Sequence, residues 1–123
     1  MYDVVVVGGG PAGSSTAATL AKGHDVIVIE EHDRIGEPVQ CAGLITEHSI
    51  ELSGVRPVIL NRYTASNVIF PNGKVVTVGS DETKAVMIDR SDFDRKLSEK
   101  AIDAGAAETL SLPGIDTFIS KIS

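Results

Sequence analysis

Residues 4–13 read VVVVGGGPAG, and this stretch decides the fold class. The four valines predict a short buried strand over residues 2–7, because strands covered on both faces read as unbroken apolar runs. The glycines after it predict a turn, and the small residues 14–22 predict a helix that ends at Gly23. A second apolar run over residues 25–29 predicts another strand. A strand, turn, helix and strand within about 30 residues predict a right-handed crossover between parallel strands.

The glycines follow the spacing Gly8-x-Gly10-x-x-Gly13, and Glu30 closes the second strand. This context predicts a dinucleotide site. Gly8 would permit the tight turn, Gly10 would let the backbone approach a pyrophosphate, and Gly13 would let the helix pack against the strand. The helix N-terminus suits phosphate, and Glu30 would accept hydrogen bonds from ribose hydroxyls, which disfavours a 2′-phosphate. These residues leave open whether the dinucleotide is FAD or NAD.

The composition is that of one globular domain of 123 residues, with 42% hydrophobic and 23% charged residues. A net charge of −6 and only 4% aromatic residues argue against a nucleic-acid partner. The single cysteine excludes an internal disulfide and a cysteine-based zinc cluster, and we expect no metal site. No apolar run approaches the roughly 20 residues of a membrane span. Without a signal-peptide layout at the N-terminus, we expect a cytoplasmic protein.

After the second strand, the sequence predicts a polar loop over residues 31–43. Thr46 can cap a short helix that runs to Leu52 and ends at Gly54. Short strands are expected over residues 58–60, 66–70, 74–78 and 85–88.

A hairpin and a longer helix complete the pattern. Pro71-Asn72-Gly73 lies between two of these strands, and Asn-Gly readily takes the positive φ angles of a tight turn. Ser91, with Asp94 three residues later, predicts the start of a helix through a weak capping box. Gly105 predicts its end.

These elements predict the α/β class, as a Rossmann-like βαβ domain with a parallel sheet and a small antiparallel β hairpin insertion. We expect the domain over residues 1–105. Residues 106–123 are expected to form a divergent tail, interrupted by Pro113-Gly114, without the strand that the fold calls for after Gly105.

Three stretches resemble known families. Residues 2–13, which end in Gly-Pro-Ala-Gly, resemble the N-terminus of FAD-dependent oxidoreductases of the glutathione-reductase and hydroxylase type. Residues 34–44, RIGEPVQCAGL, resemble a segment of the geranylgeranyl reductase family, in particular of its archaeal members. Residues 88–90 and 93–97 resemble that family's arginine-then-helix segment. Family members are longer, with a later flavin-binding segment and a domain that encloses the isoprenoid, so the resemblance concerns their N-terminal portion.

The resemblance implies an FAD enzyme that reduces isoprenoid C=C bonds of archaeal membrane lipids by hydride transfer from reduced FAD. It assigns to the cofactor the residues Gly8, Gly10, Pro11, Ala12, Gly13, Glu30, Cys41, Ala42 and Arg90. Among them, Ala12 would lie at the pyrophosphate and Glu30 at the ribose. Cys41 and Ala42 would approach the flavin, and Arg90 would contact FAD from the following helix. Cys41 is also a candidate catalytic acid.

Some of these residues have ordinary alternatives. Cys41 could be a small apolar side chain, and Arg90 could balance one of the aspartates beside it. Arg34 could be a solvated charge or a cofactor contact. Three histidines show neither metal-ligand spacing nor a paired acid and are expected at the surface: His24, His32 and His48.

Three other functions stay open: a flavin monooxygenase or hydroxylase, an NAD-binding dehydrogenase domain, and a non-catalytic nucleotide-binding remnant. Residues 38–41 favour the reductase over the monooxygenase, which shares only the first motif. The resemblance implies an isoprenoid lipid substrate, and either a separate C-terminal half or an electron donor as partner. Peripheral contact with a membrane is compatible with such a substrate, although no basic amphipathic helix supports it.

Overall fold

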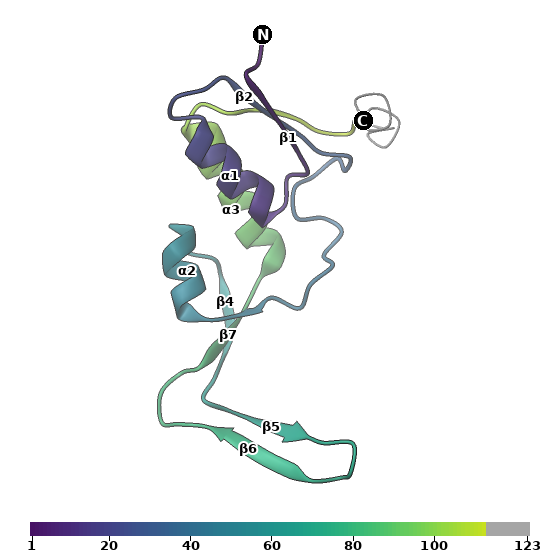
Figure 1. Ribbon diagram of the computed structural model, residues 1–123, viewed down its shortest axis with the longest axis vertical. Helices are drawn as coiled ribbons and strands as arrows, with labels where there is room; N and C mark the ends of the chain where they lie inside the picture. Colours follow the sequence, from purple (N-terminus) through teal and green to yellow (C-terminus); the bar gives the residue numbers. More distant parts are fainter. Residues whose placement is uncertain (113–123) are drawn as a thin grey trace.

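Three helices and eight strands, arranged in three small sheets, make up residues 1–112, which the computed structural model describes. The expected interruption at Pro113-Gly114 lies outside these residues. In chain order the elements are β1 (Val4–Val7), α1 (Pro11–Leu20), β2 (Val26–Ile29), β3 (Leu44–Ile45), α2 (Glu47–Ser53), β4 (Ile59–Tyr63), β5 (Ala65–Ile69), β6 (Val75–Gly79), β7 (Ala85–Ile88), α3 (Arg90–Asp103) and β8 (Ala107–Thr109). Figure 1 shows the parallel sheet with α1 and α3 at one end and the β5–β6 hairpin at the other.

The parallel sheet has the strand order β1-β2-β8, which confirms the predicted βαβ unit. β1 and β2 pair in register from Val4 with Val26 to Val7 with Ile29. A strand does follow Gly105, contrary to the expected divergent tail. Ala107 pairs with Ile27 of β2 in the parallel sense. The apolar signal of β8 is weak because its three residues, Ala-Glu-Thr, are only half-buried.

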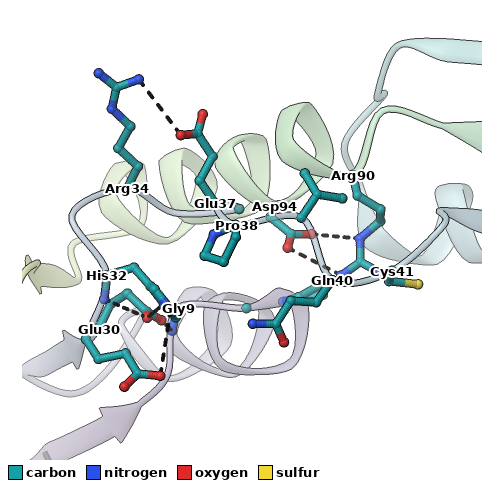
Figure 2. Close-up of a pocket in the computed structure, with 15 residues that line it drawn as sticks. Gly9, Glu30, His32, Arg34, Glu37, Pro38, Gln40, Cys41, Arg90 and Asp94 are labelled. Atoms are coloured by element: carbon teal, nitrogen blue, oxygen red, sulfur yellow. Dashed lines mark hydrogen bonds and ion pairs between the residues drawn. The ribbon is translucent and has the colours of Figure 1, made fainter.

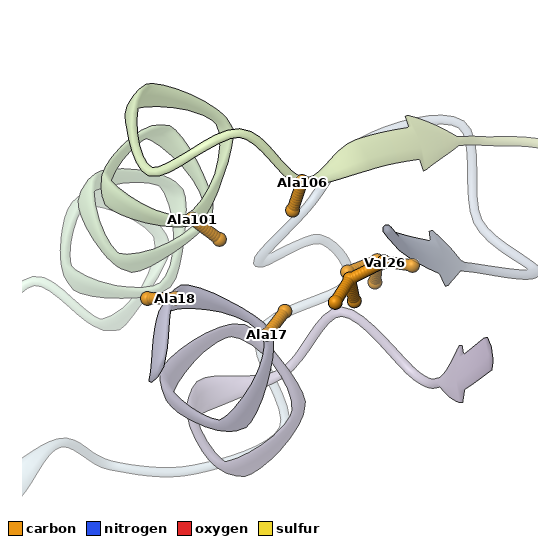
Figure 3. Packing of buried hydrophobic residues seen from close by; sticks show 6 residues of the cluster. Ala17, Ala18, Val26, Ala101 and Ala106 are labelled. Atoms are coloured by element: carbon orange, nitrogen blue, oxygen red, sulfur yellow. The ribbon is translucent and has the colours of Figure 1, made fainter. Parts of the chain in front are cut away.

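Small side chains form the core beneath this sheet. Ala17 and Ala18 of α1 pack against Ala101 of α3, and Val26 and Ala106 close the cluster from the sheet side (Figure 3). Because alanine leaves the two helices close together, a larger side chain at a fully buried position such as Ala17 would force them apart.

A second core lies between α3, α2 and the antiparallel sheet β3-β7-β4. Phe93 and Leu97 are four residues apart, a spacing that places them on one face of α3. They pack here against Ile50, Val86 and Ile88. α3 therefore joins the two cores, since its later residue Ala101 belongs to the first. Through α3, the position of the sheet β3-β7-β4 is fixed relative to the glycine loop over residues 8–13.

The predicted hairpin is present as β5 and β6, paired from Ala65 with Gly79 to Ile69 with Val75. Gly73 in its turn has φ +82°, as the Asn-Gly signal predicts. All residues of both strands are exposed, so the hairpin adds almost nothing to either core.

The helix boundaries show which local signals hold. α2 begins after Thr46, whose side chain accepts a hydrogen bond from Ser49 N–H, and ends at Gly54 with φ +69°, both as predicted. α1 begins at Pro11, three residues before the expected start, because proline suits the first helical position. α3 begins at Arg90, before Ser91, because Asp89 is the residue that caps it.

Candidate functional site

The glycine loop has the geometry that its spacing predicts. Gly8 has φ +96°, and its N–H donates to the carbonyl of Ile29 over 2.8 Å, which ties the loop to the end of β2. A Cβ on Gly13 would overlap the carbonyl oxygen of Gly8 and lie 3.3 Å from Val6 Cγ1. A Cβ on Gly10 would meet nothing within 4 Å. The loop thus needs glycine at 8 for its positive φ and at 13 for close packing, and at 10 it leaves open space.

The N-terminus of α1 is free to receive an anion. Gly10 caps it without a side chain, and no acidic residue lies in the first turn. Ser14 at the next turn is buried, and its hydroxyl donates to the carbonyl of Gly9 over 3.0 Å, so it supports the loop from behind. N–H groups at a helix N-terminus with no side-chain cap are ready donors for a phosphate.

A cavity of about 290 Å³ opens beside the loop (Figure 2). The cofactor-assigned residues that line it are Gly10, Pro11, Glu30, Cys41 and Arg90, and Arg34 lines it as well. The others do not line it: Gly8 and Gly13 shape the loop, whereas Ala12 and Ala42 are exposed next to lining residues. Figure 2 shows Glu30 and Gly9 at one end of the cavity, and Arg90 and Cys41 at the other.

Glu30 stands at the end of β2 with only 9% of its surface exposed. Its Oε2 accepts from Gly9 N–H over 2.7 Å. Its Oε1 accepts from His32 N–H over 3.1 Å and lies 2.6 Å from His32 Nδ1. Burial alone would raise the pKa of Glu30, but these hydrogen bonds outweigh it and hold the pKa below its usual value. Glu30 is therefore a carboxylate, fixed against the glycine loop.

The chain after β8 holds the backbone on which Glu30 stands. Glu30 N–H donates to Thr109 O over 2.9 Å, and Leu112 N–H donates back to Glu30 O over 3.2 Å. Ser111, with φ +54°, donates its N–H to His32 O over 2.9 Å. The residues expected to form a divergent tail therefore support the predicted ribose site.

At the other end of the cavity, Arg90 is held by Asp94 one helical turn later. Arg90 Nε lies 3.1 Å from Asp94 Oδ1, and Nη2 lies 3.3 Å from Oδ2. Hydrogen bonds to Asp94 raise the pKa of Arg90, and the nearby thiol of Cys41 acts in the same direction. Arg90 thus does balance an aspartate, but this pairing also holds its guanidinium at the cavity beside Cys41.

Two glycines bring the loop over residues 31–43 against α3. Gly36 has φ +81°, and a Cβ there would lie 2.9 Å from the backbone of Ser91. Gly43 has φ +78°, and a Cβ would lie 2.5 Å from Ile88 O. Any other residue would push the loop away, so these contacts place Cys41 beside Arg90.

Sequence reasoning missed Gly9 and His32 among the residues of the site, and it considered Asp94 only as one of the aspartates that could balance Arg90. The expectation that His32 lacks a paired acid was wrong, because its ring lies against Glu30. The signal for Asp94 was present, since residues four apart on a helix face each other. The ligand atoms of Glu30, Glu31 and His32 lie within 4.8 Å of one another. The hydrogen bonds already made by Glu30 account for this grouping without a metal ion.

A second cavity, of about 660 Å³, lies between the sheet β3-β7-β4 and the β5–β6 hairpin. Its lining is mainly apolar and includes Leu44, Tyr63, Val68 and Met87, with Lys84 as its one cation among the described residues. Only two residues separate Leu44 from Cys41, which lines the first cavity.

Comparison with known proteins agrees with this arrangement. The FAD dependent oxidoreductase family matches residues 3–49. The digeranylgeranylglycerophospholipid reductase of Methanocaldococcus jannaschii is 41% identical over 110 residues, which cover 86% of this chain and 28% of that protein. The structure of a geranylgeranyl bacteriochlorophyll reductase-like protein from Thermoplasma acidophilum superposes with a TM-score of 0.80 at 30% identity, over 89% of this chain and 30% of that one.

The chain is a homologue of the geranylgeranyl reductases.

It spans about 28% of the length of the curated reductase it matches. The flavin-dependent brominase Bmp2, in a triple-mutant form, has a TM-score of 0.66 at 25% identity, over 89% of this chain and 30% of that one, so the fold extends to other flavin enzymes. These comparisons confirm the expected fold class and support FAD over NAD as the cofactor. Among the described residues, no helix of this geranylgeranyl reductase homologue has the length and apolar character to cross a membrane.

Proposed function

We propose that this chain binds FAD through its first cavity and forms the FAD-binding portion of an oxidoreductase that reduces isoprenoid C=C bonds. The observation that carries the proposal is the polarity of the cavity along its length. One end joins an open helix N-terminus to the Glu30 carboxylate, and the other joins Arg90 to Cys41. A dinucleotide bound along the cavity would place its pyrophosphate at the helix N-terminus and its ribose at Glu30, with its far end toward Arg90 and Cys41.

The residues present fit FAD. The open space at Gly10 and the uncapped N-terminus of α1 suit a pyrophosphate. The Glu30 carboxylate suits ribose hydroxyls, and its negative charge disfavours a 2′-phosphate. Arg90, held by Asp94, offers a fixed positive charge toward the flavin side. Ala12 would contribute through its backbone at the helix start.

Bound FAD, once reduced by an electron donor, would supply the hydride, and the chain's own residues would bind and orient the cofactor. Cys41 is the candidate proton donor, through its Sγ at the cavity wall. A proton given up by Sγ would be replaced from solvent, to which Cys41 is exposed.

The second cavity supports an apolar substrate. A lipid chain of isoprenoid type would match its mainly apolar lining. The ammonium of Lys84, which lies 3.6 Å from Glu82 Oε2, could exchange this exposed partner for a phosphate head group. The short connection from Cys41 to Leu44 would bring that chain close to the flavin end. An electron donor, and a segment that encloses the flavin, would complete the activity. Such an enzyme would work in the cytoplasm, in peripheral contact with the membrane that holds its lipid.

The test has two measurements. Calorimetric titration of the purified chain gives its dissociation constants for FAD and for ADP. The visible spectrum after incubation with FAD and desalting shows whether flavin is retained. A volume of about 290 Å³ is at the low end of small-molecule sites, which run from about 300 to 1,000 Å³, so we expect weak binding. Gly10→Val should abolish it, because the side chain would enter the open space. Gly23→Val is the matched control, since a Cβ there also meets nothing within 4 Å.

Equal affinity of wild type and Gly10→Val for both ligands would contradict the proposal. Binding of NAD in preference to FAD would favour a dehydrogenase domain instead. A folded chain that binds neither nucleotide, but is captured with a larger protein, would favour a non-catalytic remnant.

A further inference from the structure

We propose that His32 competes internally for the ribose site: its imidazole occupies an acceptor on Glu30 that a nucleotide ribose needs, and it must leave when the nucleotide binds. The inference rests on the proposed function, because it takes Glu30 as the ribose acceptor. It adds a residue that controls affinity without belonging to the glycine motif.

The Glu30 carboxylate has a limited capacity to accept hydrogen bonds. A carboxylate offers about four lone-pair sites, two on each oxygen. Oε1 takes both the N–H and Nδ1 of His32, and Oε2 takes the N–H of Gly9. Only one site is then left, on Oε2. A ribose that offers its two neighbouring hydroxyls to this carboxylate needs two.

Of the three contacts, only one can be given up by a side-chain rotation. The Gly9 and His32 N–H groups belong to the backbone, and the His32 backbone is itself held by Ser111. The His32 ring is different, because 36% of its side chain is exposed. Its other nitrogen, Nε2, lies 3.9 Å from the carboxylate of Glu31, which is 59% exposed and holds it weakly. The ring can therefore turn toward solvent while Glu30 stays in place.

The competition depends on the number of hydroxyls that the ligand presents. ADP, with both hydroxyls, must displace the imidazole, and this breaks the 2.6 Å hydrogen bond between His32 Nδ1 and the charged Glu30. 2′-Deoxy-ADP presents only the 3′-hydroxyl and can use the remaining site on Oε2. Removal of the imidazole should therefore help ADP and leave 2′-deoxy-ADP unchanged.

The experiment measures the dissociation constants of ADP and 2′-deoxy-ADP for the chain by calorimetry at neutral pH. His32→Phe keeps a ring of similar shape but has no donor, and we expect it to bind ADP about three- to ten-fold more tightly than wild type. Its affinity for 2′-deoxy-ADP should match wild type. His32→Asn places an amide N–H near the position of Nδ1, so it should restore the wild-type affinity for ADP.

Each other result overturns the inference. Weaker ADP binding by His32→Phe would mean that His32 positions Glu30 rather than competing with the ligand. An equal gain for both nucleotides, or no gain for either, would show that the imidazole does not occupy a ribose acceptor. Failure of wild type and both variants to bind ADP would overturn the proposed function, and this inference with it.

Discussion

The contact between α1 and the glycine loop can be tested by one methyl group, in Gly13→Ala. The new Cβ would overlap Gly8 O and lie 3.1 Å from Gly8 C, so backbone rather than a mobile side chain must yield. We expect α1 to move away from β1 by about 1 Å, at a strain of about 3 kcal/mol. Alanine returns about 1 kcal/mol because it favours the helix over glycine. The net loss of stability should be about 2 kcal/mol.

The assay is urea denaturation of the chain followed by far-ultraviolet circular dichroism. In thermal denaturation of a chain of this size, the same loss of stability would lower the Tm by roughly 6–12 °C. Gly23→Ala is the control, because its Cβ meets nothing within 4 Å and its φ is not in the left-handed region. It should change stability by less than about 0.5 kcal/mol. If Gly13→Ala is as stable as wild type, the close approach of helix and strand is not what requires glycine here.

Three further outcomes follow from the described contacts. The pKa of folded Glu30 is lowered, so its stabilising effect is present above the ordinary carboxyl range and is lost as pH falls through the lowered pKa. In urea denaturation, Glu30→Gln should therefore be less stable than wild type at neutral pH, and the difference should shrink as the pH falls below the ordinary carboxyl range. Asp89→Ala should lower the free energy of unfolding by about 0.5–2 kcal/mol because it removes the cap of α3. Ser91→Ala should leave it nearly unchanged in the same urea denaturation. A larger loss for Ser91→Ala than for Asp89→Ala would mean that Ser91 is the cap. In hydrogen exchange, amides of β5 and β6 should exchange far faster than those of β2, and equal protection would mean that the hairpin is covered in solution.

Local signals in the sequence were sufficient for the first half of the fold. The valine run and the glycine spacing act within a few residues of themselves, so β1, α1 and β2 could be predicted together with the roles of Gly8 and Gly13. Thr46 and Gly54 are likewise caps that act on their own helix. The start of α3 was misplaced because Asp89 and Ser91 are both good capping residues, and the choice between them depends on where β7 ends.

What the sequence could not show depends on contacts between distant segments. β8 has no apolar pattern of its own and is a strand because β2 offers a free edge. His32 looked like a surface residue because nothing local indicates that its ring turns back onto Glu30. The pairing of Arg90 with Asp94 was within reach of helical spacing, but the approach of Cys41 needed the packing of Gly36 and Gly43 against α3.

The hydrogen bonds between residues 109–112 and the backbone of Glu30 and His32 couple the predicted ribose site to the end of β8. The backbone of Glu30, whose carboxylate would receive the ribose, is hydrogen-bonded to Thr109 of β8 and to Leu112 just after it. If a nucleotide binds Glu30 more tightly while these hydrogen bonds are formed, its binding stabilises them, and their loss weakens nucleotide binding by the same free energy. Nucleotide affinity and the hydrogen bonding of residues 109–112 are then two measures of a single equilibrium.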